Sequence, residues 1–153
     1  MLRYGLAIAL LVIILDQVTK QVVLGGFATG EVREVLPFFN LVLVWNRGVS
    51  FGMFGSAGVP WLLSGIALAV VIGLAIWLRR AESRVVASGL ALVIGGALGN
   101  VIDRVRFGAV VDFLDVHAFG WHWPAFNVAD SAICIGAAVL VLDGLLAPRS
   151  QTT

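Results

Sequence analysis

Two aspartates stand where a carboxyl group could take part in catalysis. Asp112 lies in "VVDFLDV", and Asp130 lies in "FNVAD" at the start of a long apolar stretch. Two carboxyl groups that lie close together do not both ionise, so one keeps its proton while the other activates water against a peptide carbonyl. A low dielectric at a membrane surface would strengthen this difference. The pair is therefore suggestive of an aspartic hydrolase.

Each aspartate also has a structural interpretation. At the start of a helix, Asp130 would be an N-cap that accepts backbone hydrogen bonds, a role that is compatible with catalysis. Asp112 would be a solvated loop residue, since Asp115 shows that acidic residues occur in the same segment. Residue type and position leave both interpretations open.

Other hydrolytic chemistries lack their characteristic residues. The only histidines are His117 and His122, and no H-E-x-x-H motif occurs, which argues against a zinc peptidase and predicts no metal site. Ser64 and Ser88 have neither a Gly-x-Ser-Gly setting nor a histidine within a helix, as an intramembrane serine protease would require. The stretch nearest to Gly-x-Gly-Asp ends in Asn100.

The elements that position these residues are expected to lie in a membrane. The 153-residue chain is 60% hydrophobic and 12% charged, against roughly 25% charged residues in soluble domains, and its mean hydropathy is +1.02. We expect an α-helical integral membrane protein whose residues 1–153 form a single domain. A net charge of +1 without a basic patch argues against nucleic-acid binding. The single cysteine, Cys134, is expected to be a small core residue.

Apolar runs near 20 residues, the length that crosses about 30 Å of hydrocarbon, occur four times. They cover residues 5–24, 60–78, 85–102 and 128–146. They predict four transmembrane helices and two outer segments, residues 25–59 and 103–127. The first segment contains "VLPFFNLVLVW", whose β-branched and aromatic residues favour short strands. In the second, Trp121 and Trp123 are typical of a membrane interface.

The arginines indicate the orientation of the spans. The side that holds both termini carries an excess of positive charge: Arg3, Arg79, Arg80, Arg84 and Arg149 against Glu82. Charges on the other side balance: Arg33, Arg47, Arg104 and Arg106 against Glu31, Glu34, Asp112 and Asp115. The positive-inside rule therefore predicts that both termini are cytoplasmic. A cleavable signal peptide in the first span is disfavoured, because no small-x-small site promptly follows its apolar core.

Polar residues gather at the outer ends of three predicted spans. Asp16 and Lys20, four residues apart, share a helical face in the first span. The fourth span begins with Asp130, and the third ends with Asn100, Asp103 and Arg104. Charged groups cost about 2.5 to 3.5 kcal/mol each at the centre of a span, so each needs a partner or a function. Asp16 with Lys20, and Asp103 with Arg104, would serve as ion pairs that hold helices together.

Five blocks of the sequence resemble bacterial lipoprotein signal peptidase, also called signal peptidase II. The blocks are "DQVTK" at 16–20, "NRGVSFGMF" at 46–54, "GGALGNVIDR" at 95–104, "VVDF" at 110–113 and "FNVAD" at 126–130. They stand in the family's order over nearly the whole chain. The resemblance implies a four-helix aspartic protease in the bacterial cytoplasmic (inner) membrane, with its active site at the outer face, and it implies no cofactor and no obligate protein partner.

The resemblance also implies a substrate and a set of site residues. The enzyme would remove the signal peptide from prolipoproteins that already carry diacylglycerol, cutting on the amino side of the lipid-modified cysteine, so this substrate and membrane lipid would be its partners. Asp112 and Asp130 would be the catalytic pair. Polar residues would line or support the site: Asp16, Lys20, Asn46, Asn100, Asp103, Arg104 and Asn127. Arg104 would suit a lipid phosphate or a substrate carbonyl, because a guanidinium is always charged.

Two other classes of function stay open. A small transporter would spread its charged residues near the midplane along a pathway, whereas these crowd one boundary. A noncatalytic membrane assembly factor would account for the outer segments but not for five blocks in order. Whether Asp112 and Asp130 are both required for turnover distinguishes the enzyme from such a factor.

Overall fold

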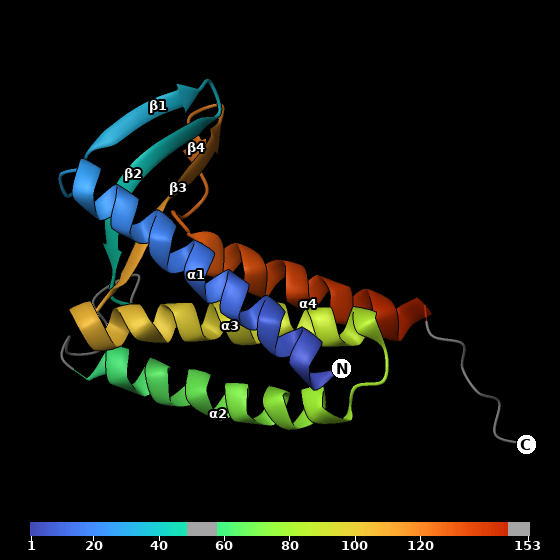
Figure 1. The fold of residues 1–153 in the computed structure, drawn as a ribbon. Helices are drawn as coiled ribbons and strands as arrows, with labels where there is room; N and C mark the ends of the chain where they lie inside the picture. The colour runs from blue at the N-terminus through green and yellow to red at the C-terminus, as the bar shows by residue number, and fades with distance from the viewer. Residues whose placement is uncertain (49–57, 147–153) are drawn as a thin grey trace, which may run out of the picture.

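Four helices account for the four predicted spans. The computed structural model describes residues 1–48 and 58–146. The helices are α1 (Leu2–Gly26), α2 (Val59–Arg80), α3 (Arg84–Phe107) and α4 (Val128–Leu146). Each is long and apolar enough to cross a membrane, so the predicted four-helix membrane fold is confirmed. The start of α1 and the end of α4 lie at the same end of the bundle (Figure 1).

The third helix extends further than its apolar run. It continues to Phe107, so Asp103 and Arg104 belong to the helix and not to an outer segment. Gly108 ends the helix in the left-handed conformation, with φ 69° and its N–H bonded to the Arg104 carbonyl, a conformation that glycine adopts without steric cost. The hydropathy of the last turn is low because it contains Arg104 and Arg106.

The centre of the bundle is α3. It packs against α1, α2 and α4, and an apolar core forms around it from Ala9, Leu78, Ala87, Leu90, Ala91 and Ile94. Close approach of α4 depends on Gly96, because a Cβ at this position would collide with the Ala129 carbonyl oxygen. Small residues allow such approach between membrane helices.

A four-stranded antiparallel sheet stands at the end of the bundle opposite the start of α1 (Figure 1). Its strands, in spatial and chain order, are β1 (Val32–Leu36), β2 (Phe39–Asn46), β3 (Val110–Ala118) and β4 (Trp121–His122). The strands predicted in the first outer segment are confirmed as β1 and β2. The strands of the second segment are not foreseen from sequence, because the first half of β3 is buried on both faces and shows no alternation of polar and apolar residues.

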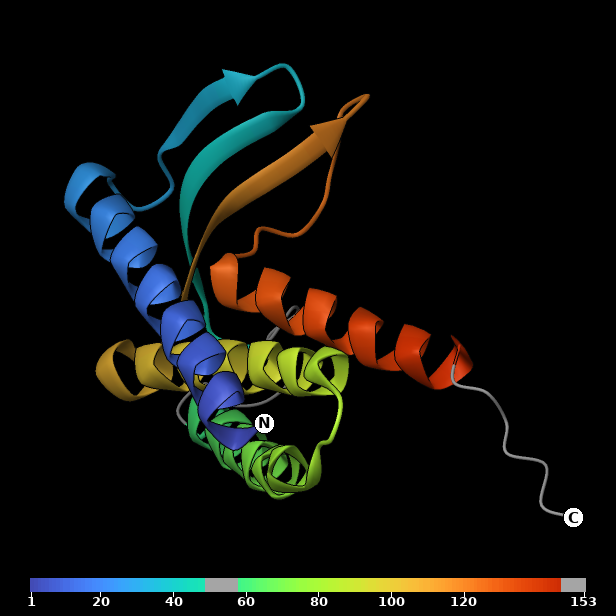
Figure 2. The same ribbon diagram turned by 45° about the vertical axis from the view of Figure 1, so that its right-hand side comes forward.

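The sheet is anchored on the C-terminal end of α1. Figure 2 shows β2 and β3 curving away from the helices, with their lower ends between α1 and α4. A second apolar cluster joins Val23 of α1 to Leu43 of β2 and to Val111 and Phe113 of β3. Because successive side chains of a strand point to opposite faces, this anchor directs Asp112 to the other face of β3.

Two side-chain expectations have different outcomes. Cys134 is exposed on α4, so its prediction as a core residue is wrong. The buried residues of α4 are Ala129, Ala132 and Gly136, and Cys134 lies outside that narrow stripe. Trp121 and Trp123 are both exposed and pack edge to face with ring centroids 5.8 Å apart; their interfacial role stays a prediction.

Candidate active site

Asp112 occupies the buried part of β3. It lies opposite Val44 of β2 and is 1% exposed, so its interpretation as a solvated loop residue is wrong. Asn127 Nδ2 donates to its Oδ1 at 2.7 Å, and Asn46 Nδ2 donates to its Oδ2 at 2.9 Å. Both carboxyl oxygens are thus held by side-chain amides.

The environment of Asp112 favours the neutral carboxyl group. Burial raises the pKa of Asp112 from 3.8 to about 6, and the negative charge of Asp130 adds to the rise. The hydrogen bonds from Asn46 and Asn127 act in the opposite direction, as does the charge of Lys20. A carboxyl group with this pKa can hold a proton at mildly acidic pH.

Asp130 is the third residue of α4, and Asn127 precedes the helix. The Asp130 N–H donates to Asn127 Oδ1 at 2.9 Å, and the Asn127 N–H donates to Asp130 Oδ2 at 3.2 Å. This is a capping box, so Asn127 is the N-cap and Asp130 is its reciprocal partner. Asp130 Oδ1 remains for Asn100, whose Nδ2 donates to it at 2.8 Å.

A single network joins the two aspartates. Asn127 is fully buried and donates both to Asp112 and, at 3.2 Å, to Asn100 Oδ1. Asn100 in turn donates to Asp130. The amide pair therefore connects a carboxyl group of β3 to a carboxyl group of α4.

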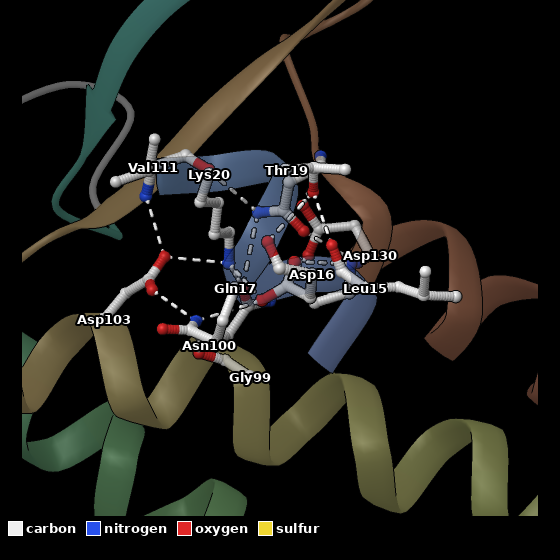
Figure 3. Close-up of polar contacts among 12 residues, drawn as sticks. Leu15, Asp16, Gln17, Thr19, Lys20, Gly99, Asn100, Asp103, Val111 and Asp130 are labelled. Carbon is white, nitrogen blue, oxygen red and sulfur yellow. Dashed lines mark hydrogen bonds and ion pairs between the residues drawn. The ribbon is translucent and has the colours of Figure 1, made fainter. Parts of the chain in front are cut away.

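The network continues to the buried ammonium of Lys20. Its Nζ lies 2.8 Å from Asp16 Oδ2, 2.7 Å from Asp103 Oδ2 and 3.1 Å from Asn100 Oδ1, as Figure 3 shows. The predicted pair of Asp16 with Lys20 is therefore present. The predicted pair of Asp103 with Arg104 is wrong, because adjacent residues of a helix do not face each other and Asp103 instead joins Lys20 across α1 and α3.

The two carboxylates beside Lys20 also satisfy backbone donors of other elements. Asp16 Oδ1 accepts from the Ala129 N–H in the first turn of α4 at 3.0 Å, and Asp103 Oδ2 accepts from the Val111 N–H of β3 at 3.1 Å. Gly99 leaves the room that Asp16 needs, since a Cβ there would lie 2.6 Å from Asp16 Oδ2. The cluster thus fixes α1, α3, α4 and β3 against one another.

Gln17 is a member of the cluster that sequence reasoning misses. Its Nε2 donates to Asp103 Oδ1 at 2.9 Å and also lies 3.2 Å from Asp16 Oδ2. An amide beside Asp16 in an apolar span is the signal that would have identified it.

Arg104 adjoins the network without a hydrogen bond to it. Its side chain is partly buried, and its Nε has no hydrogen-bond partner in the described part of the chain. The charges that act on it are those of Asp130, Asp103 and Asp112. Apart from Arg104, the site residues predicted from sequence all belong to the one network.

A cleft of about 380 Å³ opens beside Asp112. Its lining is shared by β2, β3 and the segment before α4: Val44, Trp45, Asn46, Arg47, Asp112, Pro124 and Ala125. Asn46 and Arg47 begin the block predicted over residues 46–54, and the rest of that block from residue 49 lies outside the described residues. Within residues 1–48 and 58–146, no group of three or more His, Cys, Asp or Glu side chains could hold a metal ion.

Asp115 belongs to a separate cluster further along the sheet. It accepts from Asn40 Nδ2 at 2.8 Å and pairs with His122, whose ring stacks on His117 at a centroid distance of 4.8 Å. Burial favours its neutral form, but the hydrogen bonds from His122 and Asn40 hold the pKa of Asp115 below its usual value. The two histidines thus brace the sheet and do not reach the Asp112 network.

The fold and this site define a class: a four-helix membrane protein with a carboxyl pair where the helices meet an outer sheet. The family described as "Signal peptidase (SPase) II" matches residues 8–146. The chain is 48% identical over 143 residues to the lipoprotein signal peptidase of Burkholderia thailandensis, covering 92% of this chain and 86% of that protein. It is 49% identical over 144 residues to that of Ralstonia nicotianae, covering 92% and 83%.

Solved structures agree with these relatives. One bacterial membrane enzyme superposes with a TM-score of 0.84 at 33% identity, covering 94% of each chain. A second gives a TM-score of 0.79 at 32% identity, covering 97% of this chain and 94% of that one. The chain belongs to the signal peptidase II family, and the resemblance drawn from its five blocks is confirmed.

Proposed function

We propose that this member of the signal peptidase II family is an aspartic endopeptidase with Asp112 and Asp130 as its catalytic pair. It removes the signal peptide from prolipoproteins that carry diacylglycerol, cutting on the amino side of the lipid-modified cysteine. The observation that carries the proposal is the pair of carboxyl groups, one from β3 and one from α4, joined through Asn127 and Asn100. Residues 1–153 act as one membrane peptidase domain.

The two aspartates take different roles. Asp112 is buried and its pKa is raised to about 6, which suits the group that carries the proton. Asp130 lies in the first turn of α4, where the helix dipole favours a negative charge, and it is partly exposed, which suits the group that activates water. Asn100 donates to its Oδ1 and the Asn127 N–H donates to its Oδ2, so both oxygens are held in place.

The reaction follows from these roles. Water attacks the scissile carbonyl carbon and transfers a proton to Asp130, while Asp112 protonates the carbonyl oxygen. In the tetrahedral intermediate the carbon–nitrogen bond then breaks. The proton on Asp130 passes to the leaving nitrogen, and the hydroxyl proton of the intermediate returns to Asp112 as the new carboxyl group forms. Both aspartates regain their starting states, and no cofactor enters the cycle.

The position of the pair supports an active site at the outer face of the bacterial inner membrane. The pair lies at the end of the bundle from which the sheet extends, and α1 starts at the opposite end (Figure 1). The last turn of α2 holds Arg79 and Arg80, and α3 begins with Arg84. Under the positive-inside rule these arginines indicate that this end is cytoplasmic. Both termini are therefore proposed to be cytoplasmic. Arg149 lies outside the described residues.

The surroundings of the pair fit a lipidated peptide. The cleft beside Asp112 is open and carries both apolar and polar side chains, which suits polypeptide next to the scissile bond. Arg104 retains a free Nε donor within the described residues and is proposed to bind a lipid phosphate or a substrate carbonyl. A transport pathway would require charges near the midplane, and an assembly factor would not require a coupled carboxyl pair.

The test is cleavage of a purified diacylglyceryl prolipoprotein by the full-length protein in lipid or detergent. Wild type is expected to release a product that begins at the modified cysteine, as identified by mass. Asp112→Asn and Asp130→Asn are expected to lower turnover by about 10³-fold or more, while remaining folded and able to bind substrate. An intact substrate with folded wild type, or near-normal turnover in either variant, contradicts the proposal.

A further inference from the structure

We propose that Lys20 is a positioning residue for the catalytic pair: by holding the side-chain oxygen of Asn100, it makes Asn100 donate its amide hydrogen to Asp130. The inference rests on the proposed role of Asp130 as the base. Lys20 does not touch Asp130 in this arrangement. Lys20 on α1 orients the amide group of Asn100 on α3, and this amide donates to Asp130 on α4.

The orientation of Asn100 follows from the chemistry of its neighbours. A lysine ammonium has hydrogen-bond donors and no acceptor, so the atom of Asn100 that lies 3.1 Å from Lys20 Nζ must be the oxygen. The amide nitrogen then points to Asp130 Oδ1 at 2.8 Å. Figure 3 shows Asn100 on α3, below Lys20 of α1 and Asp130 of α4.

The other amide of the network has its own means of orientation. Asn127 Oδ1 accepts from the Asp130 N–H as part of the helix cap, which leaves Nδ2 to face Asp112. The same Nδ2 lies 3.2 Å from Asn100 Oδ1 and supports the orientation that Lys20 imposes. Of the two asparagines, Asn100 is thus the one whose orientation depends on a charged side chain.

The contact with Asn100 exceeds what charge compensation requires. Lys20 is 1% exposed, and a buried ammonium needs opposite charge close by. Asp16 and Asp103 supply that charge at 2.8 and 2.7 Å. The third bond of the ammonium therefore remains for a different role, and it is the bond that leads to the catalytic pair.

Loss of Lys20 would change the hydrogen bond that Asp130 receives from Asn100. Without the ammonium, Asn100 is free to turn its oxygen toward Asp130, and an oxygen at hydrogen-bond distance favours a protonated carboxyl group. The other charged groups around Asp130 are Asp112 on β3 and Arg104 on α3, and Lys20 itself lies between Asp16 and Asp103. A base that holds a proton cannot accept one from water, so turnover falls.

The first test is the double variant Lys20→Met with Asp16→Asn, compared with Asp16→Asn alone. Relative to wild type, the double variant removes one positive and one negative charge and so keeps the net charge of the cluster; Asp16→Asn alone shows the effect of losing that carboxylate. An amide at position 16 can still accept from the Ala129 N–H, and Asp103 keeps its donors Gln17 and Val111. We expect kcat to fall about 10- to 100-fold, KM to change by less than about threefold, and the acid limb of the pH–rate profile to move to higher pH.

Two further variants complete the experiment. Asn100→Asp keeps an oxygen for Lys20 but removes the hydrogen donated to Asp130, so it is expected to show the same loss of kcat and the same movement of the acid limb. Thr19→Val is the matched control. Thr19 lies beside Lys20 on α1, and among residues 1–48 and 58–146 its hydroxyl bonds only to the carbonyls of Leu15 and Asp16, so the pH profile of the variant should match wild type.

Each outcome separates this inference from the proposed function. If folded wild type fails to cleave the prolipoprotein, the proposed function fails and the inference with it. If wild type cleaves and the folded double variant keeps the kcat and acid limb of Asp16→Asn, the role of Lys20 is overturned. The role of Lys20 is also overturned if the double variant loses turnover only in proportion to its lower amount of folded protein and its acid limb is unchanged. If the double variant does not fold, full turnover in Asn100→Asp overturns the inference, and a loss of turnover supports the hydrogen bond from Asn100 to Asp130 on which the inference depends.

Discussion

The two halves of α3 are both buried but are held in different ways. In the inner half, Ala87, Leu90 and Ala91 are completely buried among apolar side chains. At the end near the sheet, Asn100 and Asp103 are also buried, and hydrogen bonds and ion pairs join them to α1, α4 and β3. One helix therefore changes from packing to polar bonding along its length.

The first half is held by close packing, whereas the polar groups of the second half join the proposed catalytic pair. Between membrane helices the hydrophobic effect contributes little, so close contact of small residues holds the inner half. Buried polar groups cost free energy unless they are fully bonded, so the outer cluster is retained where those groups position a reaction. Asp112 is the sharpest example, because its raised pKa means that the folded protein disfavours its charged form.

The largest expected effect comes from Asp112→Asn, which should have opposite consequences for activity and stability. Turnover falls about 10³-fold or more. Because folded wild type binds the Asp112 proton more tightly than the unfolded chain does, wild type loses stability as the pH rises from 3.8 to about 6, and the loss persists above that range. The variant avoids a pH-dependent loss of up to about 3 kcal/mol. Thermal unfolding in detergent between pH 4 and pH 8 measures this difference.

The control for this prediction is Asp143→Asn, which removes the same charge near the inner end of α4. Its unfolding temperature should keep the pH dependence of wild type. An Asp112→Asn variant whose stability falls with pH as steeply as that of wild type would contradict the assignment of Asp112 as the buried proton carrier.

The next effect tests the inner half, where Gly136→Ala should reduce stability and leave the chemistry intact. The added Cβ would lie 2.6 Å from the Gly89 carbonyl oxygen and 2.9 Å from Leu92 Cβ, so α3 and α4 must separate. We expect a loss of about 1 to 3 kcal/mol with an unchanged pH–rate profile for the enzyme that remains folded. Gly73→Ala on α2, where a Cβ meets nothing within 4 Å, should show no such loss. Equal losses of stability in the two variants would contradict the role of close packing between α3 and α4.

A smaller effect is expected from Arg104→Ala. If the free guanidinium donor binds the substrate's lipid or carbonyl, KM for the diacylglyceryl prolipoprotein should rise about tenfold, with less change in unfolding temperature. Arg106→Ala is the matched control, because Arg106 lies two residues further along α3, is exposed over Phe107 and donates to Gln17 Oε1 at 3.3 Å. Lipid binding and KM that stay the same in Arg104→Ala would remove the support for this role.

The smallest effect is a shift in pH dependence from Asn46→Leu. Asn46 donates to Asp112 and lowers its pKa, so its loss should raise that pKa. Because Asp112 acts in its protonated form, the alkaline limb of the pH–rate profile should move to higher pH, by about half a unit. Asn40→Leu removes the equivalent bond from β2 to Asp115 and should leave the limb in place; movement of the limb in both variants would point to a general loosening of the sheet.

Features that depend on neighbours along the chain can be predicted from the sequence. Apolar runs of membrane length gave the four helices, because hydrocarbon requires them to satisfy their own backbone groups. The spacing of Asp16 and Lys20 placed both on one helical face, and the blocks around Asp112 and Asp130 identified the family before any contact was known.

The tertiary structure alone decided how these groups meet. Asp103 bonds to Lys20 and not to its neighbour Arg104, Asn127 takes the N-cap position that Asp130 was expected to fill, and Asp112 is buried in a strand that the residue pattern does not reveal. Each of these contacts joins elements far apart in the chain. They depend on how α1, α3, α4 and β3 pack together, and spacing along one helix or strand carries no information about that packing.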